Sequence, residues 1–412
     1  MPQEKIIQLL LDLLKIDEFS LQRDDLERIS QEDWQALYHL ATEQKVCPLL
    51  YHGLKEQNLL SAAPEDIQQA LTELYYLNAR RNARIVHQLG QIAEALRAAS
   101  IPMIPLKGAY LAEAVYPNIA LRQMNDIDLL VRKGDLAQTV EIFRGMGYQP
   151  LKPFSLNTKL SHHHLPEFSK PNATLVEIHW HIDLPENLPH FEISDFWDQA
   201  RPIEVNGISL LSLSPEDVLL YICFHNAYHQ FTINGLRPYC DIRAAIQRFS
   251  DELDWDLVLE RTEKRGWERY VYPSLLLARE FVGAAIPNRV LDALKPDHSH
   301  TDSVCAFIRE RTFAEKPFWE EMNQRIAVTT QMSVPQKMIF FLRRFFPSRF
   351  EIAEKFQVPP DWLSTLPRYP LQWVDLLTRH WKTMSDVHGG DHEQTKLAAN
   401  VGQFLLWLSG DQ

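Results

Sequence analysis

The chain has 412 residues, with 42 lysines and arginines against 54 aspartates and glutamates, and a formal net charge of −12. Its length exceeds the usual size of one domain, so two or three structural units are expected. The acidic balance argues against a broad surface that coats nucleic-acid phosphates, so extended nucleic acid is not an expected partner.

The first segment, residues 1–15, is apolar but is interrupted by charged side chains. It predicts an amphipathic helix rather than a signal sequence, because no small-residue cleavage site follows. No later apolar run reaches the roughly 18 residues that span a bilayer, so we expect a cytoplasmic protein without membrane contact. Widely spaced cysteines with no CxxC pair predict reduced, mostly buried thiols. They are Cys47, Cys223, Cys240 and Cys305.

The apolar pattern divides the chain into three parts. Helical spacing of apolar side chains predicts a helical N-terminal region, residues 1–99. Short apolar runs separated by turns predict an α/β unit over residues 100–213, and the Asn206-Gly207 step near its end predicts a two-residue hairpin. Ser214-Pro215-Glu216 then supplies a cap, a first-turn proline and an early acid. A helix should begin there and open a helical C-terminal region, residues 214–412.

The segment DIDLLV, residues 126–131, carries the most informative residues of the chain. On a strand Asp126 and Asp128 project from one face, about 6.6 Å apart along the chain. Adjacent like charges on an apolar strand need cations nearby, and Mg²⁺ accepts carboxylate and phosphate oxygens together. Two such ions can activate a hydroxyl and neutralise leaving pyrophosphate. By itself, a DxD pattern is more often a turn cap followed by a solvated strand residue than a metal site. The neighbouring motifs must therefore decide between these two interpretations.

Upstream of this pair, IPMIPLKGAYLAEAVYP predicts a buried strand, a turn at Lys107-Gly108 and a helix. A helix start of this kind exposes backbone N–H groups to an anion, so a phosphate could bind there. Lys107 either pairs with that phosphate or is an ordinary lysine in a turn. Arg122 either contacts a triphosphate or compensates Asp126.

Downstream, LVEIHWHI alternates so that Glu177, His179 and His181 share one face of a predicted strand. Glu177 is the natural third carboxylate, as a metal ligand or as a general base, against the alternative of an exposed strand glutamate. The run at residues 162–164 adds three histidines. Consecutive strand residues point to opposite faces, so a zinc site built from this run with His179 and His181 is not expected.

On the helix expected after residue 214, His225 and His229 lie one turn apart, but no glutamate follows His225 as in HExxH. A zinc site is therefore not indicated there either. Because these helices follow the α/β unit directly, His225, His229 and Asp241 are candidates for the wall of a cleft, as are His179 and His181 on the strand.

Together, LKGAYLAEAVYP, LRQMNDIDLLV, a following helix that ends in GMGY, and VEIHWHI resemble a poorly characterised bacterial nucleotidyltransferase family of the DNA polymerase β superfamily. The likeness is strongest over residues 101–182, and HNAYHQF with LRPYCDIRAAI extends it. The resemblance implies an α+β fold with a small mixed sheet between helical regions, a glycine-containing turn for nucleotide phosphates, and three carboxylates that bind Mg²⁺. It carries over to Gly108, Asp126, Asp128 and Glu177.

One departure from the wider superfamily lies at the phosphate turn. The usual Gly-Ser pair is replaced by Lys107-Gly108-Ala109, which removes a serine hydroxyl that often contacts phosphate. Either Lys107 substitutes for that contact, or the donor differs from an ordinary nucleoside triphosphate, such as a nucleotide-activated sugar.

Three functions follow from these residues. The first is a Mg²⁺-dependent nucleotidyltransferase that moves a nucleoside monophosphate from an NTP to a hydroxyl or phosphate of an acceptor. The second is a catalytically silent nucleotide-binding or scaffold protein, which the missing serine favours and the intact acid pair opposes. The third is a toxin-like transferase that acts on tRNA or protein.

Overall fold

A computed structural model gives the architecture of two compact units. The first comprises Met1–His298 with Arg311–Phe313, and the second comprises Ser299–Glu310 with Ala314–Gln412. The sheet and every candidate site residue belong to the first unit. The residues that the structure describes are 1–15, 21–156, 162–205, 207–229, 231–297, 300–314, 349, 352, 356, 358, 361–374, 403, 404, 407 and 408.

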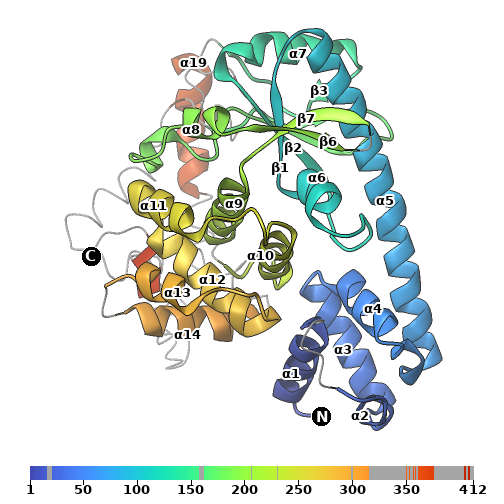
Figure 1. Cartoon of the computed structure of the whole chain (residues 1–412). Helices are drawn as coiled ribbons and strands as arrows, with labels where there is room; N and C mark the ends of the chain where they lie inside the picture. Colours follow the sequence, from blue (N-terminus) through green and yellow to red (C-terminus); the bar gives the residue numbers. More distant parts are fainter. Residues whose placement is uncertain are drawn as a thin grey trace. The chain divides into compact units, whose positions relative to one another are not determined.

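Helices fill the described chain before the sheet (Figure 1). The predicted amphipathic helix is confirmed, since five apolar side chains of α1 are buried, including Ile6 and Leu10. The Ser30 hydroxyl caps α3 by accepting a hydrogen bond from the Asp33 N–H. The long α5 then runs up to the sheet (Figure 1). These elements are α1 (Gln3–Leu14), α2 (Arg23–Glu27), α3 (Gln31–Glu43), α4 (Cys47–Glu56), the 3-10 turn η2 (Leu60–Ala62) and α5 (Glu65–Ala98).

A five-stranded mixed sheet follows, in the order β1-β2-β5-β4-β3 among the described residues. The central strand β2 pairs antiparallel with β1 and parallel with β5. The predicted α+β fold with a small mixed sheet and flanking helices is therefore confirmed. The strands are β1 (Met103–Leu106), β2 (Asp126–Val131), β3 (Gln149–Pro150), β4 (Phe168–Ser169) and β5 (Leu175–His179), and the elements between them are α6 (Lys107–Tyr110), the π-helical turn η3 (Leu111–Val115), η4 (Lys133–Asp135) and α7 (Leu136–Gly145).

The two faces of the sheet have different roles. Alternate residues of β2, Ile127, Leu129 and Val131, belong to a buried apolar cluster with side chains of α5 and α7. Since strand side chains alternate between faces, Asp126 and Asp128 lie on the opposite face. One face of β2 thus stabilises the fold while the other presents its carboxylates.

The predicted hairpin after the sheet is confirmed. Val205 on β6 lies opposite Ile208 on β7 in an antiparallel pair. Gly207 in the connection has φ +76°, a left-handed conformation that glycine adopts without steric cost. The elements here are η5 (Pro185–Asn187), α8 (Ser194–Asp198), β6 (Arg201–Val205) and β7 (Ile208–Ser212).

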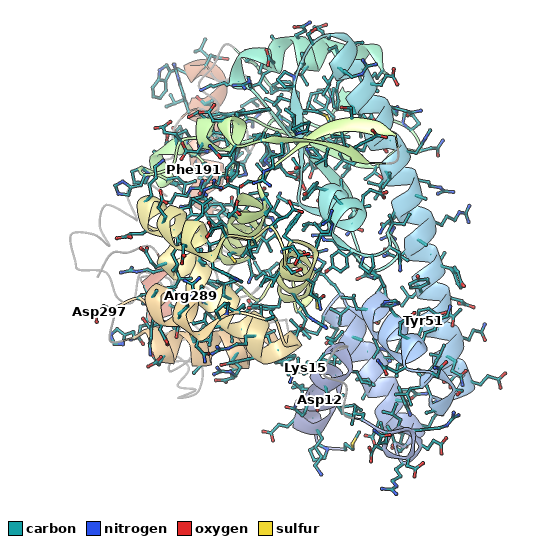
Figure 2. The ribbon with its side chains drawn as sticks, in the orientation of Figure 1. Asp12, Lys15, Tyr51, Phe191, Arg289 and Asp297 are labelled. Atoms are coloured by element: carbon teal, nitrogen blue, oxygen red, sulfur yellow. The ribbon has the colours of Figure 1, made fainter. Side chains whose placement is uncertain are left out.

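The predicted helix start at Ser214-Pro215 is confirmed as well. The Ser214 hydroxyl accepts a hydrogen bond from the Asp217 N–H, and Pro215 opens α9. The ring of Phe191, labelled in Figure 2, lies 5.2 Å from the ring of Trp267, which joins the segment after β5 to the start of α12. The helices are α9 (Pro215–Tyr228), α10 (Arg237–Arg248), α11 (Trp255–Arg265), α12 (Glu268–Val282) and α13 (Asn288–Leu294).

Beyond α13 the structure describes three helical elements, α14 (Thr301–Thr312), α19 (Trp362–Thr365) and the 3-10 turn η6 (Leu366–Arg368). Much of the helical C-terminal region predicted for residues 214–412 lies outside the described residues. Among the helices that are described, none combines the length and the apolar composition that crossing a membrane requires.

Candidate active site

The parallel pairing of β2 with β5 brings two of the predicted carboxylates together. Asp128 lies opposite Glu177 in the register of the two strands, and Asp126 lies opposite Leu175. Asp128 is 1% exposed, whereas Asp126 and Glu177 are only partly buried. The three carboxylates therefore share one face of the sheet, with Asp128 the most deeply buried of them.

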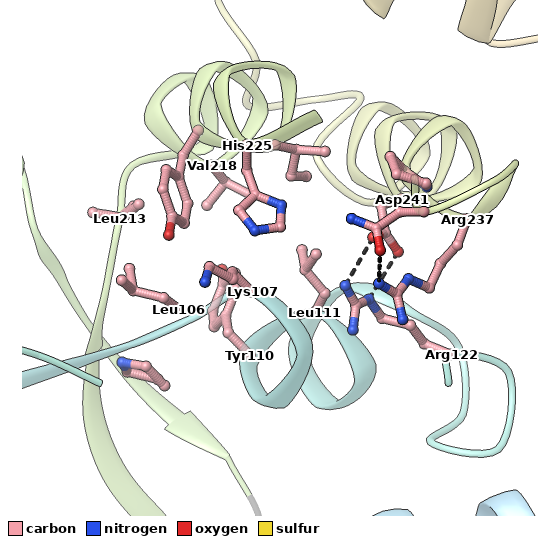
Figure 3. A pocket seen from close by; sticks show the side chains of 15 residues that line it. Leu106, Lys107, Tyr110, Leu111, Arg122, Leu213, Val218, His225, Arg237 and Asp241 are labelled. Atoms are coloured by element: carbon pink, nitrogen blue, oxygen red, sulfur yellow. Dashed lines mark hydrogen bonds and ion pairs between the residues drawn. The ribbon is translucent and has the colours of Figure 1, made fainter. Parts of the chain in front are cut away.

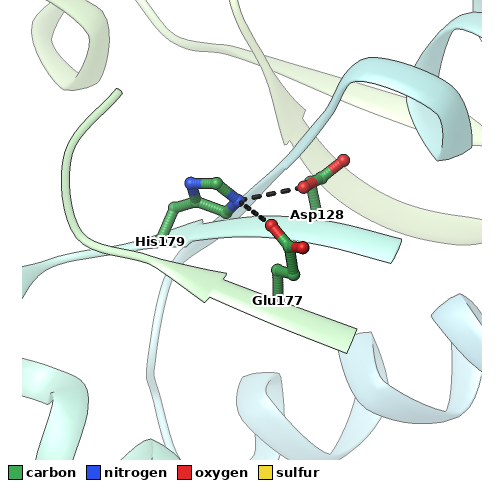
Figure 4. A group of neighbouring side chains, drawn as sticks. All are labelled: Asp128, Glu177 and His179. Atoms are coloured by element: carbon green, nitrogen blue, oxygen red, sulfur yellow. Dashed lines mark hydrogen bonds and ion pairs between the residues drawn. The ribbon is translucent and has the colours of Figure 1, made fainter. Parts of the chain in front are cut away.

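His179 completes a compact group with Asp128 and Glu177 (Figure 4). Its Nε2 lies 2.9 Å from Asp128 Oδ1 and 3.2 Å from Glu177 Oε2. One ligand atom from each of the three residues lies within 4.8 Å of the others. Two carboxylates and an imidazole at this spacing form a donor set that can hold a divalent cation. Asp126 stands outside this group, on the same face.

Lys107 reaches the group from the end of β1. Leu106 lies opposite Asp128 in the antiparallel pair, so the next residue emerges beside the carboxylates. Lys107 Nζ lies 3.0 Å from Asp128 Oδ1. The backbone of Lys107 has φ +47°, a left-handed conformation that is unfavourable for a residue with a Cβ. Such conformations gather at functional sites, where the surrounding structure holds them in place.

The charges of this group shift one another's protonation. Burial favours the neutral form of Asp128, but the Lys107 ammonium and the His179 imidazole hold the pKa of this carboxyl well below its usual range. Burial also opposes protonation of His179, yet hydrogen bonds to Asp128 and Glu177 raise its pKa. Burial and then the Asp128 charge raise the pKa of Asp126. Asp128 is therefore the anion around which the Lys107 ammonium and the His179 imidazole are arranged.

Gly108 makes room for two side chains of the segment before β2. A Cβ at this position would lie 2.7 Å from Arg122 Nη1 and 2.9 Å from the Met124 Cβ. Close packing therefore requires a glycine at this position, independently of any role that Gly108 has in phosphate binding.

Arg122 has a partner that neither sequence interpretation anticipated. Its Nε and Nη2 donate to the two carboxylate oxygens of Asp241 at 2.8 and 2.9 Å. The Tyr116 hydroxyl donates to the same carboxylate at 2.8 Å. All three side chains are buried, so this cluster fastens the segment before β2 to α10. Of the three guanidinium nitrogens of Arg122, only Nη1 does not bond to Asp241. It donates a long hydrogen bond of 3.5 Å to the Gln123 carbonyl.

A small cavity opens beside Lys107. Residues of β1 and α6 form one side, and residues of α9 and the start of α10 form the other (Figure 3). In this view Lys107 and His225 lie near the middle of the lining, Leu106 and Leu213 lie to one side of them, and Arg122, Arg237 and Asp241 gather on the other side. Two of the candidate cleft residues, His225 and Asp241, therefore do line a cavity.

The other histidines occupy supporting positions. His229 Nε2 lies 3.1 Å from His225 Nε2, and burial lowers the pKa of His229 to about 4. The His181 ring packs 5.6 Å from Phe191. The rings of His163 and His164 stand 5.4 and 5.2 Å from the His179 ring. Among the described residues, the group whose ligand atoms lie close enough together to hold a metal ion is the one formed by Asp128, Glu177 and His179.

Sequence reasoning named His179 only as a candidate for the cleft wall, and it missed Arg237. His179 was recognised as a neighbour of Glu177 on one strand face, but only the register of β5 with β2 makes it a neighbour of Asp128. Arg237 carried no local signal, because nothing in the sequence relates the start of α10 to Lys107.

The chain is similar to known proteins in sequence and in structure. The family profile described as "Uncharacterised nucleotidyltransferase" matches residues 30–283, more than half of the chain. The crystal structure of an antigenic nucleotidyltransferase-like protein from Paracoccidioides brasiliensis is similar at 17% sequence identity and a TM-score of 0.30, covering 48% of this chain and 93% of that chain. No curated protein matches. The chain belongs to the family of uncharacterised nucleotidyltransferases and is a transferase enzyme.

Proposed function

We propose that the protein transfers a nucleoside monophosphate from a nucleoside triphosphate to a hydroxyl or phosphate of an acceptor, and that the reaction requires Mg²⁺. The observation that supports this most directly is the meeting of Asp128, Glu177 and His179, with Asp126 on the same face. Family membership supports the reaction class.

The residues present fit a divalent cation. Asp126, Asp128 and Glu177 offer the oxygen atoms that Mg²⁺ prefers, and the His179 imidazole nitrogen is an additional donor that Mn²⁺ also accepts. When bound, such ions lower the pKa of an attacking hydroxyl and neutralise charge on the departing pyrophosphate.

The phosphates of the donor are assigned to the start of α6. Lys107 Nζ stands between Asp128 and the cavity, where its positive charge can pair with a phosphate oxygen. The backbone of Gly108 follows directly after Lys107. Arg122 can contribute only its Nη1 edge, since Asp241 engages the rest of the guanidinium.

Glu177 is the proposed proton acceptor as well as a ligand. Its side chain is 19% exposed, so an acceptor can reach it, whereas Asp128 is enclosed. The acceptor oxygen forms a bond to the α-phosphorus while the bond from that phosphorus to the bridging oxygen of the β-phosphate breaks. Pyrophosphate leaves with that electron pair, and the acceptor proton passes to a Glu177 oxygen. The acceptor remains one of several classes: a small molecule, a sugar, a peptide or an RNA end.

The decisive experiment measures calorimetric binding of α,β-methylene nucleoside triphosphates with and without Mg²⁺, alongside transfer of labelled nucleoside monophosphate to an acceptor library. Metal-dependent binding and acceptor labelling are expected. Binding that is indifferent to Mg²⁺, with no labelling, would instead identify a silent nucleotide-binding protein. A growth defect on expression that Asp126→Ala relieves would identify a toxin-like transferase.

A further inference from the structure

The long helix α5 has an exposed face that is basic. Residues 74–93 contain three arginines and a histidine but no acidic residue. Arg80, Arg81 and Arg84 are all exposed. Because residues four apart are neighbours on a helix surface, Arg80 and Arg84 form one stripe and Arg81 lies beside it. A chain with a net charge of −12 therefore carries a local surface of the opposite sign on this helix.

Two of these cations have no partner in the part of the chain that the structure describes. Arg80 and Arg84 make no hydrogen bond or ion pair with a described residue. In contrast, Arg97 in the last turn of the same helix lies 3.3 Å from Glu94. Exposed arginines without acidic neighbours attract a ligand that carries several negative charges.

An exposed aromatic ring lies beside the arginines. Tyr76 is 57% exposed and stands one helical turn before Arg80. Its ring lies 5.5 Å from the ring of Tyr75 in an edge-to-face contact. Tyr75 lies 4.7 Å from the ring of Tyr51, labelled in Figure 2, and Lys55 Nζ lies 5.6 Å from the Tyr51 ring. Proteins that bind single-stranded nucleic acid combine cations for the phosphates with aromatic rings on which the bases stack.

The basic face adjoins the segment that leads into β2. Asn82 Nδ2, on the buried side of α5, donates to the Arg122 carbonyl at 2.7 Å. Arg81 Nη1 donates to Asn125 Oδ1 at 3.0 Å. Asn125 is exposed and directly precedes Asp126. The basic face therefore starts next to the end of β2 that carries Asp126, and α5 extends from there toward α4 (Figure 1).

We propose that the acceptor is the single-stranded end of an RNA, which lies along α5 with its phosphates on the three arginines and a base on Tyr76. The proposal rests on the proposed function, which leaves an RNA end as one of four acceptor classes. A small molecule or a sugar would not use such a surface, and an acidic peptide has no base to stack on Tyr76. Three cations fit a short single strand rather than an extended duplex, in agreement with the acidic balance of the whole chain.

The test is fluorescence anisotropy of the full chain with a labelled single-stranded RNA that has a free terminal hydroxyl, measured over a range of salt concentrations. We expect the logarithm of the association constant to fall with the logarithm of salt concentration at a slope of about −2, since each contacted phosphate of a single strand contributes about −0.7. The double variant Arg80→Gln/Arg84→Gln should make this slope shallower by about 1.4. No binding of the RNA would overturn the proposal.

A matched control removes the same charge from other exposed positions. Arg97→Gln/Arg144→Gln replaces two exposed arginines that pair with glutamates. It should leave the affinity and the salt dependence of RNA binding unchanged. Thermal unfolding should be the same for both double variants, since glutamine and arginine have similar helix propensities. An equal loss of RNA affinity in both double variants would show that net charge, and not the face of α5, binds the RNA.

Tyr76→Ser and polyglutamate separate RNA from an acidic protein as the partner. Tyr76→Ser should weaken RNA binding about 5- to 150-fold, which corresponds to the loss of one stacked base, and should leave polyglutamate binding unchanged. Polyglutamate that binds as tightly as RNA would overturn the assignment to RNA.

The RNA measurement and the test of the proposed function fail independently. Absence of RNA binding, with Mg²⁺-dependent binding of α,β-methylene triphosphates retained, would leave nucleotidyl transfer standing with another acceptor. RNA binding without any nucleotide binding would refute nucleotidyl transfer, and with it the role of RNA as acceptor.

Discussion

Asp128 on β2 and His179 on β5 are hydrogen-bonded across a parallel strand pair, with Oδ1 2.9 Å from Nε2 and both side chains 1% exposed. Lys107 approaches the same oxygen from β1. Three neighbouring strands in space therefore converge on one buried carboxylate. The Lys107 ammonium and the hydrogen bond from His179 reduce the repulsion expected between the two strand aspartates, and a bound metal ion would reduce it further.

Replacing Asp128 by asparagine should remove nucleotidyl transfer while the fold remains. The expected loss in kcat/KM exceeds the roughly 10- to 100-fold that follows loss of an outer-shell partner, because a proposed ligand is lost directly. Steady-state assays and calorimetry with Mn²⁺ measure the two effects. Asp251→Asn, at an exposed position, is the control. Turnover retained in Asp128→Asn with Mg²⁺ would contradict the proposed site.

Protonation of His179 should stabilise the fold when metal ions are chelated. Its pKa is raised in the folded protein, so this stabilisation is fully present below the unfolded value of about 6.5 and is lost as pH rises through the folded value. Each pKa unit of difference between the folded and the unfolded state corresponds to about 1.4 kcal/mol of stability. Urea unfolding across this pH range, compared with His179→Gln, measures the effect. Parallel pH curves for the two proteins would show that His179 is not the group responsible.

Substitution of Gly108 by alanine should destabilise the protein by about 1–3 kcal/mol, the usual cost of overpacking. The added Cβ would collide with Arg122 Nη1 and the Met124 Cβ. Thermal unfolding measures the change. Gly134→Ala is the matched control, since nothing lies within 4 Å of a Cβ there. Equal stability of the two variants would mean that Arg122 and Met124 can move away from the added Cβ without a loss of folding free energy.

Loss of Arg122 should appear mainly as instability. Arg122→Met leaves Asp241 buried without its cation, which typically costs about 3–5 kcal/mol. Asp241→Asn tests the other side of the pair, and the double variant should lose less than the sum of the two single losses. Denaturant unfolding gives the coupling free energy. Strict additivity would show that the bidentate contact contributes no coupling to stability.

The local pattern of the sequence predicts several elements because short-range physics determines them. Alternation places Asp126 and Asp128 on one strand face, and Ser214-Pro215 starts a helix through a cap and a preset proline φ. Asn206-Gly207 predicts the hairpin because the turn needs positive φ. Family motifs around residues 101–182 added the reaction class.

Tertiary structure alone decided which side chains meet. Whether Asp128 faces Glu177 or is shifted along β5 depends on a register between strands about fifty residues apart, and no local pattern encodes it. The same holds for Arg122, whose carboxylate partner proved to be Asp241, 119 residues away, rather than Asp126. A buried charge without a partner carries a large desolvation cost, so buried charges are found in pairs. Which charges are buried, and which lie close enough to pair, is determined only when the chain has folded.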